Sequence, residues 1–195
     1  MTTRRTRRFP WKLRTRCNPC NVYNVSAPVL PLLLNEKSSL FKLFLSDTGM
    51  LTTLYGRATK MQLLSDNQNI NNGAIYENIV AQELKAHGFK LYYYNSKRFG
   101  ELDFVIEYKG KVLPIEVKSG KSYQRHSALN NIMGISDYSI EEAFVFSNYN
   151  VEVKDNFIYY PIYMVMFLSD DEIVFPKVDL DDLSAIPLTN KDMMA

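Results

Sequence analysis

The fold is decided by the stretch Glu101-Leu102-Asp103-Phe104-Val105-Ile106-Glu107-Tyr108, then Lys109-Gly110, then Val112-Leu113-Pro114-Ile115-Glu116-Val117-Lys118. Both arms are rich in apolar and β-branched residues and have the length of β-strands. Strict alternation predicts that Leu102 and Phe104 lie on the same side of the first strand. The Lys109-Gly110 pair predicts a two-residue turn. We therefore expect an antiparallel hairpin at the centre of the protein.

The register of this hairpin decides which charged residues meet. A turn at Lys109-Gly110 places Asp103 opposite Glu116, and a turn one residue later places Asp103 opposite Lys118. In both registers the three charged side chains share one face of the hairpin. A three-residue loop without a compensating bulge would separate them.

The two carboxylates of this face point to metal chemistry. Like charges opposed across two strands are destabilising by up to roughly 1 kcal/mol, and a divalent cation between Asp103 and Glu116 would turn this repulsion into coordination. Lys118 on the same face could hold a nucleophile or stabilise developing charge. The alternative is a solvated polar face with an ion pair between the strands, which is common on the open side of antiparallel strands.

A helix is predicted from Ala74 to His87, because this segment contains no Pro or Gly and is followed by Gly88. Glu77 lies on or beside the apolar face of this helix and needs a partner there. Glu83 also falls within the apolar arc. Position on the helix therefore does not by itself select Glu77.

Other segments give shorter predictions. Asn21 to Pro31 is expected to be an extended connector, and Ser39 to Leu45 is ambiguous between a strand and a buried helix. Asp47 is expected to cap a helix rather than bind a ligand. The remaining predictions are a strand over Lys90–Asn95, a helix over Ser127–Met133, a strand over Ala143–Phe146, and a strand followed by a helix over Asn156–Leu168.

Charge is segregated along the chain. Residues 1–16 contain seven basic side chains and no acid, so the remaining residues carry 16 basic and 21 acidic groups, a formal net charge of −5. The basic segment has the composition of a solvated, disordered tail, and the alternative is affinity for nucleic acid. The longest apolar run, Phe157 to Leu168, has twelve residues and contains Pro161, which is too short for a membrane span. We expect a cytoplasmic protein that does not enter the membrane.

Two motifs carry little chemistry. Cys17 and Cys20 form one Cys-x-x-Cys pair without further soft ligands nearby in the sequence, so reduced thiols are expected. Gly120-Lys121-Ser122 has the ending of a phosphate-binding P-loop, but the glycine required five residues earlier is Ile115. The sequence therefore predicts no ATP site in this chain.

The spacing of four residues resembles the PD-(D/E)XK nuclease superfamily and, in its helix, archaeal Holliday-junction resolvases. The four matching positions are Glu77, Asp103, Glu116 and Lys118. The resemblance implies an α/β fold, with a restriction-endonuclease-like mixed central sheet flanked by helices. It also implies that Asp103, Glu116 and the carbonyl of Val117 bind Mg²⁺ or Mn²⁺, that Glu77 completes or orients the site, and that Lys118 positions the attacking water. Gln124 is expected to support a phosphate of the DNA.

A second resemblance covers about residues 22–168 and is to the C-terminal domain of bacterial and archaeal AAA-type ATPases, a domain of unknown function. The resemblance rests on four sequence motifs: 41–49 (FKLFLSDTG), 77–84 (ENIVAQEL), 100–104 (GELDF) and 114–120 (PIEVKSG). In that family an ATPase module precedes the domain, so we expect this chain to be a fragment or a truncated relative.

These observations give one domain plan and two functions. The expected parts are a disordered basic tail over 1–20, an extended and helical N-terminal segment over 21–66, a nuclease-like core over 67–168 and an acidic tail over 169–195. The first function is a Mg²⁺-dependent nuclease-like domain that cuts DNA phosphodiester bonds. The alternative is a non-catalytic binding or assembly domain, whose partner would be an AAA-type ATPase module or a second copy of the chain.

Overall fold

The computed structural model describes residues 19–65 and 72–170, and the predicted tails fall almost wholly outside these ranges. The strands are β1 (Cys20–Val25), β2 (Glu36–Phe44), β3 (Tyr92–Ser96), β4 (Gly100–Tyr108), β5 (Lys111–Val117), β6 (Ala143–Ser147), β7 (Glu152–Lys154) and β8 (Phe157–Pro161). The α-helices are α1 (Thr48–Leu54), α2 (Arg57–Leu64), α3 (Gly73–Ala86) and α4 (Ser127–Met133). Short 3-10 helices are η2 (Leu32–Asn35), η3 (Ser136–Tyr138) and η4 (Ile162–Phe167).

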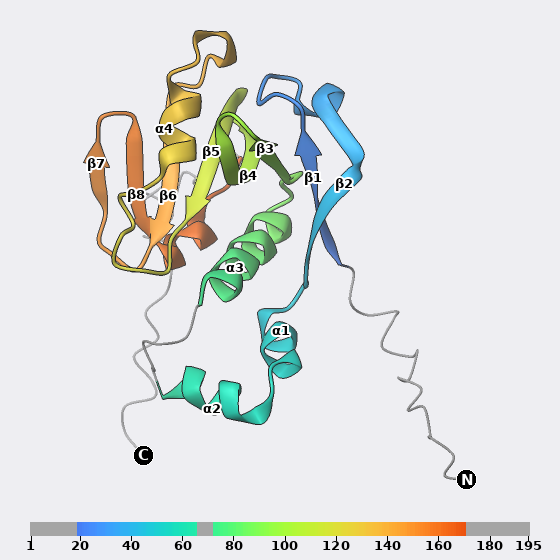
Figure 1. The fold of residues 1–195 in the computed structure, drawn as a ribbon, viewed down its shortest axis with the longest axis vertical. Coiled ribbons are helices and arrows are strands. Elements are labelled where there is room, and N and C mark those ends of the chain that lie inside the picture. Colours follow the sequence, from blue (N-terminus) through green and yellow to red (C-terminus); the bar gives the residue numbers. More distant parts are fainter. Residues whose placement is uncertain (1–18, 66–71, 171–195) are drawn as a thin grey trace, which may run out of the picture.

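The eight strands form one mixed sheet in the order β2-β1-β3-β4-β5-β6-β8-β7 (Figure 1). Neighbours pair in parallel at β1–β3, β5–β6 and β6–β8, and the remaining pairs are antiparallel. Helices pack against the sheet, so the predicted α/β class with a mixed central sheet flanked by helices is confirmed. The predicted hairpin, β4–β5, lies in the middle of this order.

The turn of the central hairpin has the predicted position. Lys109 and Gly110 both adopt positive φ angles, of 49° and 73°, as a two-residue turn between twisted strands requires. Tyr108 pairs with Lys111, and the same register continues to Phe104 opposite Ile115. The first of the two predicted registers is therefore the one that forms.

Two apolar cores lie on the two sides of the sheet. The α3-side core includes Val80, Ala81, Leu84, Phe104, Ile106, Ile115 and Val117. The α4-side core includes Leu102, Val105, Val112, Leu129, Ile132 and Val145. Both faces are thus covered by apolar residues, which explains why the three consecutive residues Phe104, Val105 and Ile106 of β4 are all apolar and buried.

The N-terminal strands correct one prediction and resolve another. Asn21–Val25 belongs to β1, between β2 and β3, and is not a connector. The polar residues Asn21 and Asn24 concealed the strand pattern, although Asn24 is buried. The ambiguous segment Ser39–Leu45 lies almost entirely in the edge strand β2.

The predicted helices at Ala74–His87, at Ser127–Met133 and after Asp47 are confirmed as α3, α4 and α1, whereas the helix predicted within Asn156–Leu168 is the 3-10 helix η4, and α2 was not predicted. Asp47 caps α1 by accepting a hydrogen bond from the backbone N–H of Met50, at 3.0 Å. Gly88 ends the α3 region with a φ of 86°. Helices α1 and α2 extend away from the sheet and contain no buried residue (Figure 1). Across residues 19–65 and 72–170, no helix is both long and apolar enough to cross a membrane.

Candidate functional site

Asp103 lies at a β-bulge in β4. On β3, Tyr92 pairs with Val105 and Tyr94 pairs with Leu102, so two residue steps on β3 face three on β4. Leu102 consequently belongs to the α4-side core and Phe104 to the α3-side core, which corrects the strict alternation predicted for this strand. The bulge places one extra residue in β4 at Asp103, next to the end of β5.

The Asp103 carboxylate binds the neighbouring strand directly. Its Oδ2 atom accepts a hydrogen bond from the backbone N–H of Val117 at 2.8 Å. This contact holds the carboxylate beside the C-terminal end of β5, where the backbone passes from Glu116 to Lys118. Asp103 is therefore held close to Glu116 and Lys118, the other two charged residues of the predicted hairpin face.

Glu116 and Lys118 are joined by a partly buried ion pair on β5. Lys118 Nζ donates to Glu116 Oε1 at 2.6 Å, and only 8% of the Glu116 side chain is exposed. The second oxygen, Oε2, is buried without a hydrogen-bond partner in the structure. A buried carboxylate oxygen without a donor is costly, so this atom is available to an electropositive ligand.

Glu77 is brought to the same site by α3. The next residue, Asn78, is buried and fixes the helix: its side chain accepts a hydrogen bond from Leu45 N at 2.8 Å and donates to Leu45 O at 3.0 Å and to Thr48 Oγ1 at 2.9 Å. These bonds join α3 to the junction between β2 and α1. Asn78 is thus a positioning residue. The sequence does not indicate this role, although Asn78 directly follows Glu77.

The electrostatics of the three acids show that they share one environment. Burial, and then the nearby Glu116 carboxylate, raise the pKa of Asp103 to about 7. Burial raises the pKa of Glu77, and the charge of Asp103 adds to that increase. Burial also raises the pKa of Glu116, against the opposing effect of its bond to Lys118. Acids from α3, β4 and β5 therefore lie within electrostatic range of one another, although up to 39 residues separate them in the sequence.

Lys42 is a further contributor that the sequence did not suggest. It projects from β2, forms an ion pair with Glu101 and lies 5.0 Å from the centre of the Tyr93 ring. Its positive charge lowers the pKa of Glu77, Asp103 and Glu116. The only sequence signal is a lysine within the otherwise apolar run 40–45, because the partners of β2 come from distant segments.

The carboxylates suit a hard divalent cation, which prefers oxygen ligands. The buried Glu116 Oε2 and the Asp103 carboxylate, whose pKa is raised to about 7 by burial and by the nearby Glu116 charge, are oxygen atoms that could bind such a cation. In the described part of the chain, however, no group of three or more His, Cys, Asp or Glu side chains is already arranged around a possible metal position. The side chains that could act as oxygen ligands are Asp103 and Glu116, and the Val117 carbonyl directly follows Glu116 in the chain.

Gln124 lies in the loop between β5 and α4. Its amide donates to Glu152 Oε2 at 3.1 Å and is also within 3.4 Å of the Tyr123 hydroxyl. These contacts direct the Gln124 amide toward β7. The residues that line the cavity beside Lys118 are instead Val117, Lys118, Ser119, Gly120, Ser122 and Arg125, and the cavity volume is about 320 Å³.

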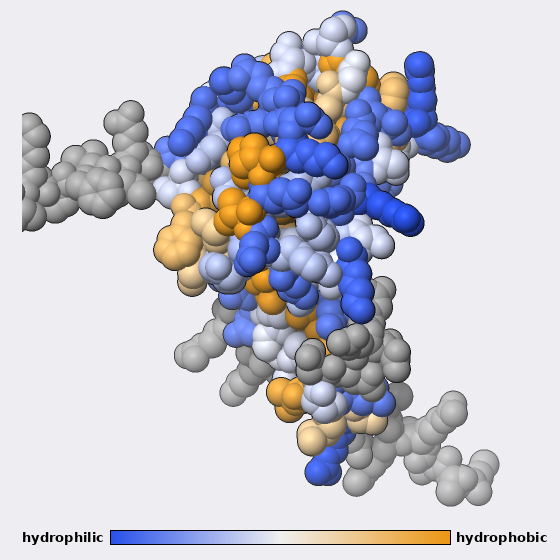
Figure 2. All heavy atoms as spheres, turned by 90° about the vertical axis from the view of Figure 1, so that its left-hand side faces the viewer, coloured by the Kyte–Doolittle hydropathy of each residue, from blue (hydrophilic) through white to orange (hydrophobic). Residues whose placement is uncertain are grey.

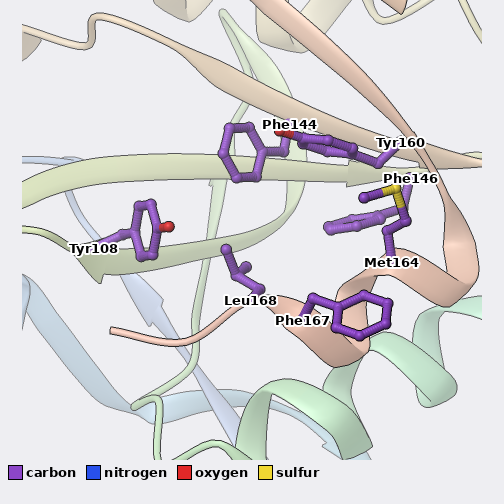
Figure 3. A pocket seen from close by; sticks show the side chains of 7 residues that line it. All are labelled: Tyr108, Phe144, Phe146, Tyr160, Met164, Phe167 and Leu168. Atoms are coloured by element: carbon purple, nitrogen blue, oxygen red, sulfur yellow. The ribbon is translucent and has the colours of Figure 1, made fainter. Parts of the chain in front are cut away.

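A second cavity, of about 150 Å³, lies at the C-terminal part of the described chain. Figure 3 shows aromatic rings of β4, β6 and β8 on one side of it and side chains from η4 and Leu168 on the other. Its lining consists of Tyr108, Phe144, Phe146, Tyr160, Met164, Phe167 and Leu168. This cavity contains no carboxylate and is chemically unrelated to the acidic site.

Comparison with known proteins gives one match. Residues 72–165, from the start of α3 into η4, match a family described as "Domain of unknown function (DUF4143)". This span contains Glu77, Asp103, Glu116 and Lys118. The chain matches no curated protein and no solved structure.

Proposed function

We propose that this chain is a nuclease-like domain that uses Mg²⁺ or Mn²⁺ to hydrolyse DNA phosphodiester bonds. The observation that carries the proposal is the meeting of three acids with raised pKa values, Glu77, Asp103 and Glu116, beside Lys118. Acids with raised pKa values beside a cation are often found at functional sites. The resemblance of these four positions to the PD-(D/E)XK superfamily supports the same function.

The proposed roles follow from the contacts. Asp103 and Glu116 would hold the cation together with the Val117 carbonyl, and the buried, unpartnered Glu116 Oε2 fits such a ligand role. When bound, a divalent cation supplies Lewis-acid polarisation of the phosphate and lowers the pKa of a bound water. Glu77 would accept a hydrogen bond from the attacking water and so orient it.

Lys118 would act on the phosphate. Its ammonium has three donors, and the contact with Glu116 Oε1 uses one of them. The remaining N–H groups can donate to a phosphate oxygen and stabilise the charge that develops as the P–O bond breaks. The ion pair with Glu116 also keeps the ammonium next to the metal-binding carboxylate.

The test is a cleavage assay with linear, branched and single-stranded DNA, with and without Mn²⁺. We expect metal-dependent cleavage by the wild type, and its loss in Asp103→Ala and Lys118→Ala. Asp137→Asn, an exposed acid in η3, is the matched control and should cleave normally. Undiminished cleavage by Asp103→Ala would contradict the assignment.

A second candidate function is a binding or assembly domain for an AAA-type ATPase module. The aromatic cavity in Figure 3 favours it, because the neighbouring η4 also exposes Tyr163, Met166 and Phe167, at 64%, 52% and 69%. Exposed apolar clusters of this kind often mark protein contacts. Figure 2 shows hydrophobic side chains in small areas among hydrophilic ones on the side of the molecule that it views.

Calorimetric titration with Mg²⁺ or Mn²⁺ separates the two candidates. A nuclease requires binding that Asp103→Asn and Glu116→Gln abolish, whereas an assembly domain needs no metal at this face. Binding that survives both substitutions would mean that the metal is held elsewhere. Absence of binding in the wild type would favour the assembly function.

A further inference from the structure

We infer that the cavity beside Lys118 is a binding site for a backbone phosphate of the DNA strand, with Arg125 as its principal cation. The inference rests on the proposed nuclease function and adds a substrate-binding site to it. The cavity lies at the C-terminal end of β5 and in the loop that follows, where Lys118 also contacts Glu116. A phosphate held there would be adjacent to the acidic site.

The lining has the chemistry of an anion site. Its ionisable side chains are Lys118 and Arg125, both cationic, and its other side chains include the hydroxyls of Ser119 and Ser122. Among residues 19–65 and 72–170, no acid lines the cavity. Guanidinium groups bind phosphate oxygens through two parallel hydrogen bonds, and hydroxyls donate to the remaining oxygens.

Arg125 is available for this role. Its side chain is exposed, and it forms no salt bridge with any residue in 19–65 or 72–170. Its backbone N–H donates to Ser122 O at 3.0 Å, which fixes the turn that carries both residues. The turn therefore holds the arginine at the cavity while its guanidinium remains unpaired.

Gly120 leaves room for a ligand. A Cβ atom added at this position would meet no atom within 4 Å, and the Gly120 backbone is outside the left-handed region. The protein itself thus has no packing reason to exclude a side chain here. Because Gly120 lines the cavity, a larger residue adds bulk at its wall without strain on the fold, which provides a steric test that is independent of charge.

The net charge of the chain outside its basic N-terminal segment affects how DNA can bind. Outside residues 1–16 the chain carries a formal net charge of −5, so the overall charge of this part of the protein repels DNA at long range. Contacts with individual phosphates must then provide much of the affinity. Loss of one such contact should be measurable in both the affinity and its salt dependence.

The experiment measures binding of a fluorescein-labelled DNA duplex by anisotropy, in EDTA so that no metal-dependent cleavage occurs. Arg125→Ala and Gly120→Val should each weaken binding roughly tenfold, the effect of one charge-assisted contact. For Arg125→Ala the slope of log K against log salt should fall by about 1. Inorganic phosphate should compete with DNA for the wild type and much less for Arg125→Ala.

Lys111→Ala is the control, because Lys111 is an exposed cation at the opposite end of β5. It should bind DNA as the wild type does. Circular dichroism confirms that each variant is folded. If Arg125→Ala and Gly120→Val both bind like the wild type, the inference is wrong, even if the protein cuts DNA. Tighter binding of an RNA duplex would overturn the assignment to DNA.

The two proposals fail separately. If the wild type cuts no DNA with Mn²⁺ but Arg125→Ala loses affinity and salt dependence as expected, the phosphate site stands and the nuclease function does not. If the protein cuts DNA, but neither Arg125→Ala, nor Gly120→Val, nor added phosphate changes its affinity for DNA, the nuclease function stands and this cavity is not its phosphate site.

Discussion

The carboxylate of Asp103 accepts a hydrogen bond from the backbone N–H of Val117 at 2.8 Å, between residues 14 positions apart in the chain. This single bond fixes the acid of β4 at the point of β5 where Glu116 and Lys118 flank Val117. It also uses only one oxygen of the carboxylate. The bond therefore positions Asp103 without consuming its capacity to bind a ligand.

The stability of the metal-free protein should decrease as the pH rises toward 7. Asp103 has a pKa of about 7 in the fold and an ordinary value of 3.8, so the folded state holds its proton more tightly than the unfolded state. Below pH of about 4 the group is protonated in both states and has no effect, and between these values deprotonation favours unfolding. Asp103→Asn should be more stable than the wild type near pH 7, with a flatter pH profile. Urea titrations at several pH values measure this difference.

Mg²⁺ or Mn²⁺ should reverse that pH dependence, because a bound cation favours the ionised carboxylates. Thermal melting of the wild type at pH 7.5 should show a metal-dependent rise in Tm that Asp103→Asn lacks. An equal rise in Asp137→Asn serves as the control for general effects of the salt. A wild-type Tm that is indifferent to both metals would contradict metal binding at this site.

Loss of the Lys42 charge should shift metal binding to higher pH. Lys42 lowers the pKa of Glu77, Asp103 and Glu116. Lys42→Met should therefore raise these three pKa values and leave the acids more protonated at neutral pH. Binding titrations across a pH series should place the midpoint of the pH dependence at a higher pH than in the wild type. Lys37→Met, on the same strand and exposed, is the matched control and should not move the profile.

Removal of the Asn78 side chain should destabilise the fold by about 3 kcal/mol, since three hydrogen bonds of roughly 1 kcal/mol each are lost. Asn78→Ala leaves the N–H and C=O groups of Leu45 without their partner. Urea denaturation measures the change in the free energy of unfolding. Asn130→Ala, at an exposed position of α4, should change it by less than about 0.5 kcal/mol. Equal effects of the two substitutions would refute the positioning role.

Gly88→Ala should cost about 1 kcal/mol, because a φ of 86° is unfavourable for a residue with a Cβ atom. No atom lies within 4 Å of the added Cβ, so the cost is conformational and not steric. Gly134→Ala is the control: its φ is −78°, its Cβ would make ordinary contacts, and it should be within about 0.5 kcal/mol of the wild type. Thermal or urea unfolding of both variants distinguishes them.

The sequence alone predicted the central hairpin, its turn at Lys109-Gly110 and the helix that carries Glu77. These features depend on neighbouring residues: a two-residue turn fixes the register, and a glycine stop fixes the helix end. The same local patterns missed β1, because Asn21 and Asn24 do not resemble a buried strand. They also missed the bulge at Asp103, which arises from pairing with β3 and not from the sequence of β4 itself.

What only the tertiary structure decided is which charges meet. Glu83 and Glu77 were equivalent on the helix, and the burial and electrostatic contacts of Glu77 select it. Lys42 joins the acids because β2, β1 and β3 are neighbours in the sheet, an order that no local pattern contains. Local sequence therefore determines the hairpin and the helix of this protein. The raised pKa values that give the acids their chemistry depend on long-range packing, since burial and proximity exist only in the folded chain.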